Sequence, residues 1–169
     1  AMGFKTLYSN TTGSDNIAIG SYALNGGQGS VHTGSMNIGI GYASLLNLTT
    51  GDGNTATGVN SLFKTETASY NTAYGYNAMY NNVSGNGNTA IGSSSLYSNS
   101  VATNNTALGN TALYANTGGY SNTALGASAM SANTIGDYNS AVGVLALGAN
   151  TSGTHNTGIG IYSGDFNDA

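Results

Sequence analysis

The sequence predicts an all-β protein, a parallel β-solenoid built from coils of 17 residues. A five-residue phrase, Asn88-Thr89-Ala90-Ile91-Gly92 in one copy, returns along the whole chain, and its closing glycines stand at 41, 58, 75, 92, 109, 126, 143 and 160. Thr and Ile alternate in it with Asn, Ala and Gly, which is the period of a strand. The recurrent glycines exclude a helix, because each interior glycine costs about 1 kcal/mol relative to alanine.

Each coil is expected to run strand, turn, strand, turn. The first strand is the repeated phrase. The second follows its glycine, where a small residue, a leucine or methionine and often a tyrosine recur, as in Ala112-Leu113-Tyr114. Here the small residue and the tyrosine are expected to share a face opposite the leucine. Polar turns such as 10–13 close the coil, and nine coils would form a rod segment of about 43 Å at the usual spacing between strands.

One array is expected to occupy residues 3–169. The repeat is interrupted once, because 12 residues separate Leu24 from Asn37 where other repeats have 8, which predicts a surface loop near residues 25–35. Ala1 and Met2 are expected to be a cloning remnant, and the array a fragment of a longer fibre.

Composition narrows the possible functions. Only 5% of the residues are charged, the net charge is −4, and there is no proline, cysteine or tryptophan. With 39% hydrophobic residues, an ordered chain is expected. Two lysines, Lys5 and Lys64, are the whole basic content, which argues against nucleic acid as a partner. No apolar run approaches the roughly 20 residues needed to cross a bilayer, so no membrane insertion is expected.

The asparagine of the repeated phrase is interpreted as structural. Stacked copies of one amide can donate and accept hydrogen bonds along the array. The predicted ladder comprises Asn54, Asn71, Asn88, Asn105, Asn122 and Asn139.

The assembly state is predicted from the thin core of each coil. About three apolar side chains, worth about 2 kcal/mol each, do not offset an ordering cost of about 1.5 kcal/mol for each residue of the coil. Neighbouring chains should supply the remainder, and the small-residue columns, which include Ala107 and Ala124, are expected to be the face on which another copy packs.

The phrase from Asn122 to Gly126, followed by Ala129-Met130 and an Asn-Thr-x-Gly turn, resembles the head repeats of trimeric autotransporter adhesins of the YadA kind. It is still more similar to repeat arrays in bacteriophage tail fibres and related bacterial surface fibres. The resemblance covers residues 3–163, although the adhesin coil is usually shorter than 17 residues. It implies a homotrimer of left-handed parallel β-rolls, outside the cell on a cell surface or virion fibre, that recognises a cell-surface glycan or another receptor.

Four residues are candidates for ligand binding. Gln28 and His32 lie in the insertion, and loops carry binding more often than scaffold does. Tyr74 and Tyr76 suit stacking against a sugar. The competing interpretations are a solvated histidine and a Tyr74 ring that fills the core.

No enzyme activity, metal site or cofactor is expected. Glycoside hydrolysis needs two carboxylates about 5 to 9 Å apart. Asp52 and Asp137 share a column but lie five coils, or about 24 Å, apart. Only Asp165 and Asp168 are close together in the sequence.

An alternative function is ice binding. A rank of hydroxyls recurs at one position of the phrase, at Thr55, Thr72, Thr89, Thr106, Thr123, Ser140 and Thr157. It could order water if it faces outward, although the residue two positions further on is apolar.

Overall fold

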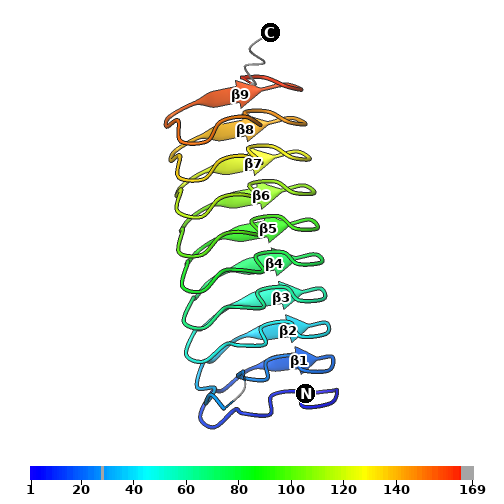
Figure 1. Cartoon of the computed structure of the whole chain (residues 1–169). Helices are drawn as coiled ribbons and strands as arrows, with labels where there is room; N and C mark the ends of the chain where they lie inside the picture. Colours follow the sequence, from blue (N-terminus) through cyan, green and yellow to red (C-terminus); the bar gives the residue numbers. More distant parts are fainter. Residues whose placement is uncertain (28, 165–169) are drawn as a thin grey trace.

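A computed structural model describes residues 1–27 and 29–164. These residues form nine short strands and no helix. The strands are β1 (Ile17–Ile19), β2 (Ile38–Ile40), β3 (Thr55–Thr57), β4 (Thr72–Tyr74), β5 (Thr89–Ile91), β6 (Thr106–Leu108), β7 (Thr123–Leu125), β8 (Ser140–Val142) and β9 (Thr157–Ile159). They pair in parallel and in chain order, so the sheet runs along the rod (Figure 1).

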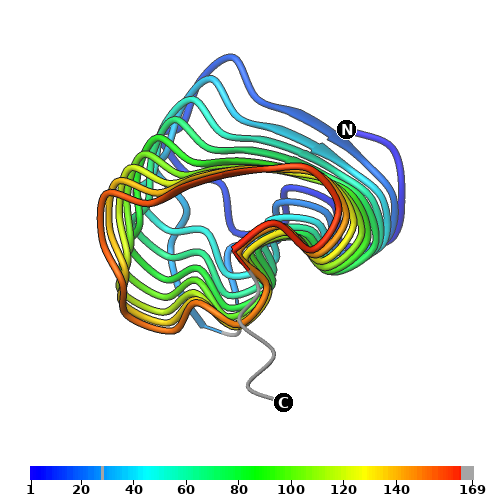
Figure 2. The same cartoon turned by 90° about the horizontal axis from the view of Figure 1, so that it is seen from above.

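The parallel β-solenoid predicted from the repeat is confirmed. Every pairing joins equivalent positions of successive phrases, as Thr89 with Thr106 and Ile91 with Leu108. Seen along the axis, the coils superimpose with a gradual rotation, and each closes through a long irregular return (Figure 2). The protein therefore comprises about eight coils of about 17 residues.

The strand faces follow the predicted alternation. The middle residue of every strand is buried, whereas its two neighbours are half-buried or exposed. Ala90 and Ala107 therefore face the interior, and the Thr and Ile positions face outward. The outer face of the sheet carries one hydroxyl rank beside one mainly aliphatic rank.

The second predicted strand is wrong. The segment after each glycine consists of turns, with positive φ at alternate residues, as at Asn77 (φ 54) and Met79 (φ 50). These left-handed residues break the two-residue period of a strand. As a result Ala78 and Met79 are both buried, and the small residue does not share an outward face with the tyrosine.

The expected contact face of small residues is also corrected. Ala107 and Ala124 are fully buried within one chain, where they pack with the interior alanines and leucines. A narrow coil interior has room for alanine opposite leucine but not for two large side chains, which explains the small residue in the strand. Exposed apolar side chains lie on the outer strand face, as at Ile91 and Leu108, and also in the return segments, as at Ile135 and Val144.

The predicted asparagine side chains form a continuous ladder inside the rod. Asn105 Nδ2 donates to Asn88 Oδ1 at 3.3 Å and to the carbonyl oxygen of Gly119 at 2.8 Å. Asn105 Oδ1 in turn accepts the backbone N–H of Asn122 at 2.9 Å. Each amide thus fastens its own coil to both neighbours.

A second inner column contains asparagine in the later coils and, at Asn10, in the first coil, with other residues in the second to fourth coils. Asn99 donates to Asn82 at 2.9 Å, and Asn133 donates to Asn116 at 3.0 Å. In the earlier coils the buried residues of this column are His32, Leu48 and Thr65.

Glycine at the end of each strand is required by geometry. Gly109 has φ of 143°, and a Cβ there would clash with the backbone of Gly126 in the next coil.

Candidate functional site

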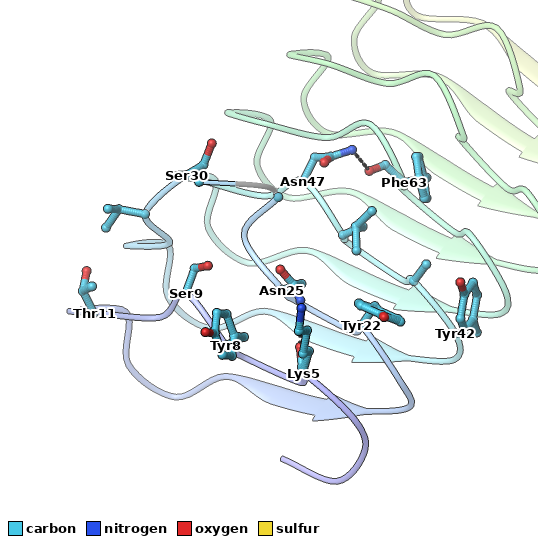
Figure 3. Close-up of a pocket in the computed structure, with 15 residues that line it drawn as sticks. Lys5, Tyr8, Ser9, Thr11, Tyr22, Asn25, Ser30, Tyr42, Asn47 and Phe63 are labelled. Carbon is cyan, nitrogen blue, oxygen red and sulfur yellow. Dashed lines mark hydrogen bonds between the residues drawn. The ribbon is translucent and has the colours of Figure 1, made fainter.

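A hollow of about 940 Å³ lies beside the insertion, near the N-terminal end of the rod. Figure 3 shows Ser30 of the insertion on one side and the side chains of Lys5, Tyr8, Tyr22 and Tyr42 along the other. The hollow is therefore formed by residues of the first coils and of the insertion.

A change in one side-chain column creates the space. The position after the buried leucine holds aromatic residues in the middle coils, where Phe63, Tyr80, Tyr97 and Tyr114 stack with ring centroids 4.9, 5.4 and 5.2 Å apart. In the second and third coils this position holds Asn25 and Leu46, which are shorter than an aromatic ring, and Tyr8 resumes the column in the first coil. The hollow occupies this gap in the aromatic column.

The aromatic wall is held in place by edge-to-face contacts. Tyr22 lies between Phe4 and Tyr42, with centroid distances of 5.5 and 5.9 Å and interplanar angles of 80° and 77°. Such pairs contribute about 0.5–1.5 kcal/mol beyond the area that they bury. The Lys5 ammonium lies 5.7 Å from the Phe4 centroid and 5.6 Å from the Tyr8 centroid. A positive charge is thus kept at the mouth of the hollow.

Two amide groups in the hollow are oriented by the backbone. Asn25 Nδ2 donates to the carbonyl oxygen of Lys5, and Asn47 Nδ2 donates to that of Phe63, both at 2.9 Å. Within the described residues neither side-chain oxygen accepts a hydrogen bond, and neither is a buried unpartnered atom. Both oxygens are available as acceptors to a ligand.

His32 is not the solvated side chain considered from the sequence. It is fully buried in the second inner column, where its Nδ1 lies 2.9 Å from Asn10 Oδ1 and its Nε2 has no hydrogen-bond partner. Burial lowers the pKa of His32 from its ordinary value of 6.5, against the opposing effect of Asp52. The backbone explains the burial, since His32 pairs with Asn10 as a coil residue, whereas its neighbours Val31 and Thr33 are exposed.

The structure does not gather the other predicted binding residues at the hollow. Gln28 lies outside the described residues. Tyr74 and Tyr76 are exposed by 61% and 57%, which contradicts the interpretation of Tyr74 as a core residue, and neither lines the hollow. The aromatic wall and Lys5 were missed as a site, although the replacement of tyrosine by Asn25 and Leu46 beside the insertion was a readable signal.

A second aromatic cluster lies toward the other end. Tyr138 meets Tyr120 edge-to-face at 5.2 Å and stacks on His155 at 5.0 Å. A side-chain hydrogen bond with Tyr138 and the charges of Tyr138 and Asp137 raise the pKa of Tyr120. These side chains border neither described hollow.

Two acidic side chains, those of Asp52 and Asp137, accept hydrogen bonds from the backbone. Asp52 Oδ1 accepts the N–H of Ser35 at 2.7 Å, and Asp137 Oδ1 accepts that of Tyr120 at 2.9 Å. Asp165 and Asp168 lie outside the described residues. In residues 1–27 and 29–164 no three histidine or carboxylate side chains are grouped so that they could hold a metal ion.

No protein-family model, curated protein or solved structure matches this chain. The part of the chain that the structure describes has no helix of the length and apolarity needed to cross a bilayer.

Proposed function

We propose that this chain is a non-enzymatic, adhesive segment of an extracellular fibre, in which three copies pack side by side as a homotrimer and recognise a cell-surface glycan. The setting is a bacterial surface fibre or a viral tail fibre, with the coils wound left-handed as in the fibre repeats that the sequence resembles.

The observation that carries the proposal is the aliphatic rank on the outer strand face. Its members are exposed or, like Leu125, half-buried in the single chain. They are adjacent in register, because Ile91 pairs with Leu108, Leu108 with Leu125 and Leu125 with Val142. Ile91 is 38% exposed, Leu108 49% and Val142 41%. A long apolar stripe of this kind is typical of a surface that another protein covers.

A second copy of the chain fits this stripe better than an unrelated partner does. The same contact is repeated coil after coil, so one favourable packing geometry is multiplied along the rod. Closed symmetry around a common axis then places the same rank of every copy at the centre. The sparse charge on the strand face also favours this arrangement, since no ion has to be desolvated.

Light scattering on strand-face variants tests the assembly. The double variant Ile91→Lys/Leu108→Lys places charges in the stripe and should convert a trimer of the 16.8 kDa chain into monomers with unchanged circular dichroism. Asn110→Lys adds a charge to an exposed residue in the return segment and should leave the trimer intact. A trimer that survives the double variant would refute the strand face as the interface.

Ice binding remains a second candidate because the hydroxyl rank does face outward. Thr89 and Thr106 are half-buried neighbours on the strand face, beside the aliphatic rank. The two functions compete for one surface, since a face covered by other copies cannot meet ice. Thermal hysteresis from a monomeric chain, abolished by Thr89→Lys, would favour ice binding over the fibre.

A further inference from the structure

We infer that the hollow beside the insertion binds an acidic saccharide, a sugar unit that carries a carboxylate. This inference rests on the proposed recognition of a glycan and adds to it the location of the site and the chemical class of the ligand.

The dimensions suit a short stretch of glycan. Tyr8 and Phe63 stand three coils apart in one column, which corresponds to about 14 Å at the spacing between strands. The column positions between them hold Asn25 and Leu46, so rings inserted there would continue the series that Phe63 and Tyr80 begin by stacking at 4.9 Å. A pyranose has an apolar C–H face and a thickness comparable to one such step.

The polar groups suit a sugar more than an apolar ligand. Asn25 and Asn47 line the hollow, and because their amide nitrogens are already engaged by backbone carbonyls, their side-chain oxygens are the groups left to accept hydrogen bonds from a ligand. Sugar hydroxyls are the matching donors. The Tyr22 ring beside them is fixed by its edge-to-face neighbours, which lowers the ordering cost of binding.

Charge selects the acidic class. Lys5 is one of two basic residues in a chain of net charge −4, and it lies at this hollow. No acidic side chain is among the described residues that line it. A carboxylate on the sugar would therefore meet an unopposed ammonium, and a charge-assisted hydrogen bond is about twice as strong as a neutral one. Three copies in one fibre would present three such sites and strengthen attachment through avidity.

The test is a titration of the intact chain with 3′-sialyllactose and with trigalacturonate, with lactose as the neutral control, followed by NMR chemical shifts. At least one acidic probe should bind more tightly than lactose, with shifts at Tyr8, Tyr22 and Asn47. Lys5→Gln should weaken that binding by about tenfold. Lys64→Gln is the matched control, because Lys64 lies over the Tyr80 ring outside the hollow, and it should bind as the parent does.

A second pair of variants tests the aromatic contribution. Tyr8→Ala removes a ring that is 71% exposed and should lower affinity several-fold without loss of the fold, whereas Tyr114→Ala, in the same column but outside the hollow, should not. Equal binding of lactose and the acidic probes, or binding unchanged by Lys5→Gln and Tyr8→Ala, would overturn the inference. Failure of both acidic probes to bind would also overturn it. If both acidic probes failed but the parent chain still attached to cells, the proposed adhesive function would stand. If the parent chain bound neither cells nor any glycan, the proposed adhesive function would be refuted as well.

Discussion

The regular coils of residues 71–160 and the N-terminal coils of residues 4–65 share one backbone plan but differ in what their side-chain columns contain. In the regular coils the second inner column is asparagine, and each amide bonds to the next, as Asn99 to Asn82. In the N-terminal coils this column holds Asn10, His32, Leu48 and Thr65. Two polar atoms there, His32 Nε2 and Thr65 Oγ1, are buried without a hydrogen-bond partner.

The difference separates coils whose inner columns are continuous hydrogen-bonded ladders from coils whose columns are interrupted. Identical side chains in successive coils hydrogen-bond or stack with one another, so a regular column leaves few free hydrogen-bonding groups for a ligand. Where successive coils carry different side chains, some polar and aromatic groups are not occupied by a neighbouring coil. The Asn25 and Asn47 oxygens, the Tyr22 face and the Lys5 charge all lie at such an interruption. The regular coils are the scaffold, and the irregular ones hold the candidate site.

The largest expected effect comes from breaking the ladder in a regular coil. Asn105→Ala removes the acceptor of the Asn122 N–H and leaves that buried group without a partner, in addition to the lost amide bonds. We expect the free energy of unfolding to fall by about 3 kcal/mol. Chemical denaturation measures the loss, and Asn110→Ala, an exposed asparagine in the same coil, should change it little. A stable Asn105→Ala variant would mean that the ladder contributes no more than the surface does.

Overpacking the interior should have the next largest effect. Ala107→Leu adds a large side chain where Ala107 is fully buried, and we expect a loss of about 2 kcal/mol in the unfolding free energy of the chain. Ala115→Leu is the matched control, since its half-buried position holds Asn47 and Lys64 in other coils. Equal thermal stability of the two variants would contradict the interior placement of Ala107.

The sequence is sufficient for the solenoid, its coil length and its strand, but not for the return segment or the site. Fixed spacing of the Asn88 and Asn105 phrases defines coil length, strand position and ladder, because stacking demands identity from coil to coil. The return segment was misread as a strand because positive φ at leucine and methionine, as at Met79, is rare and has no side-chain signature. The hollow is not predicted because it is the space left by the short side chains of Asn25 and Leu46, and its walls come from four successive coils.

Lowering the pH should reduce stability through His32, a buried residue of the N-terminal coils. The pKa of His32 is lowered by burial, so below its ordinary value of 6.5 the unfolded chain binds more protons than the folded one. Stability should therefore be complete above about pH 6.5 and should fall as the pH is lowered toward the depressed folded pKa. His32→Asn should remove this loss in pH-dependent melting, whereas His155→Asn should leave it in place. An unaltered acid response in His32→Asn would contradict the assignment.

The smallest effect on stability is expected from shortening the insertion. Deletion of 27–30 restores the 17-residue register, so circular dichroism and oligomeric state should be preserved. The deletion removes one wall of the hollow and should reduce binding to glycans or cells. If the shortened chain bound as well as the parent, the ligand site would have to lie on the regular coils, where Tyr74 and Tyr76 are the next candidates.

The most direct test of the fibre proposal asks which face of the rod lies between copies. The chain has no cysteine, so a single introduced thiol reports on one position. Leu108→Cys places it on the outer strand face, and Tyr97→Cys places it in the aromatic column of the return segment. With a short bis-maleimide, Leu108→Cys chains should cross-link to one another, and Tyr97→Cys chains should be labelled without cross-linking. Labelling of Leu108→Cys without cross-links, at the rate seen for Tyr97→Cys, would contradict the proposal.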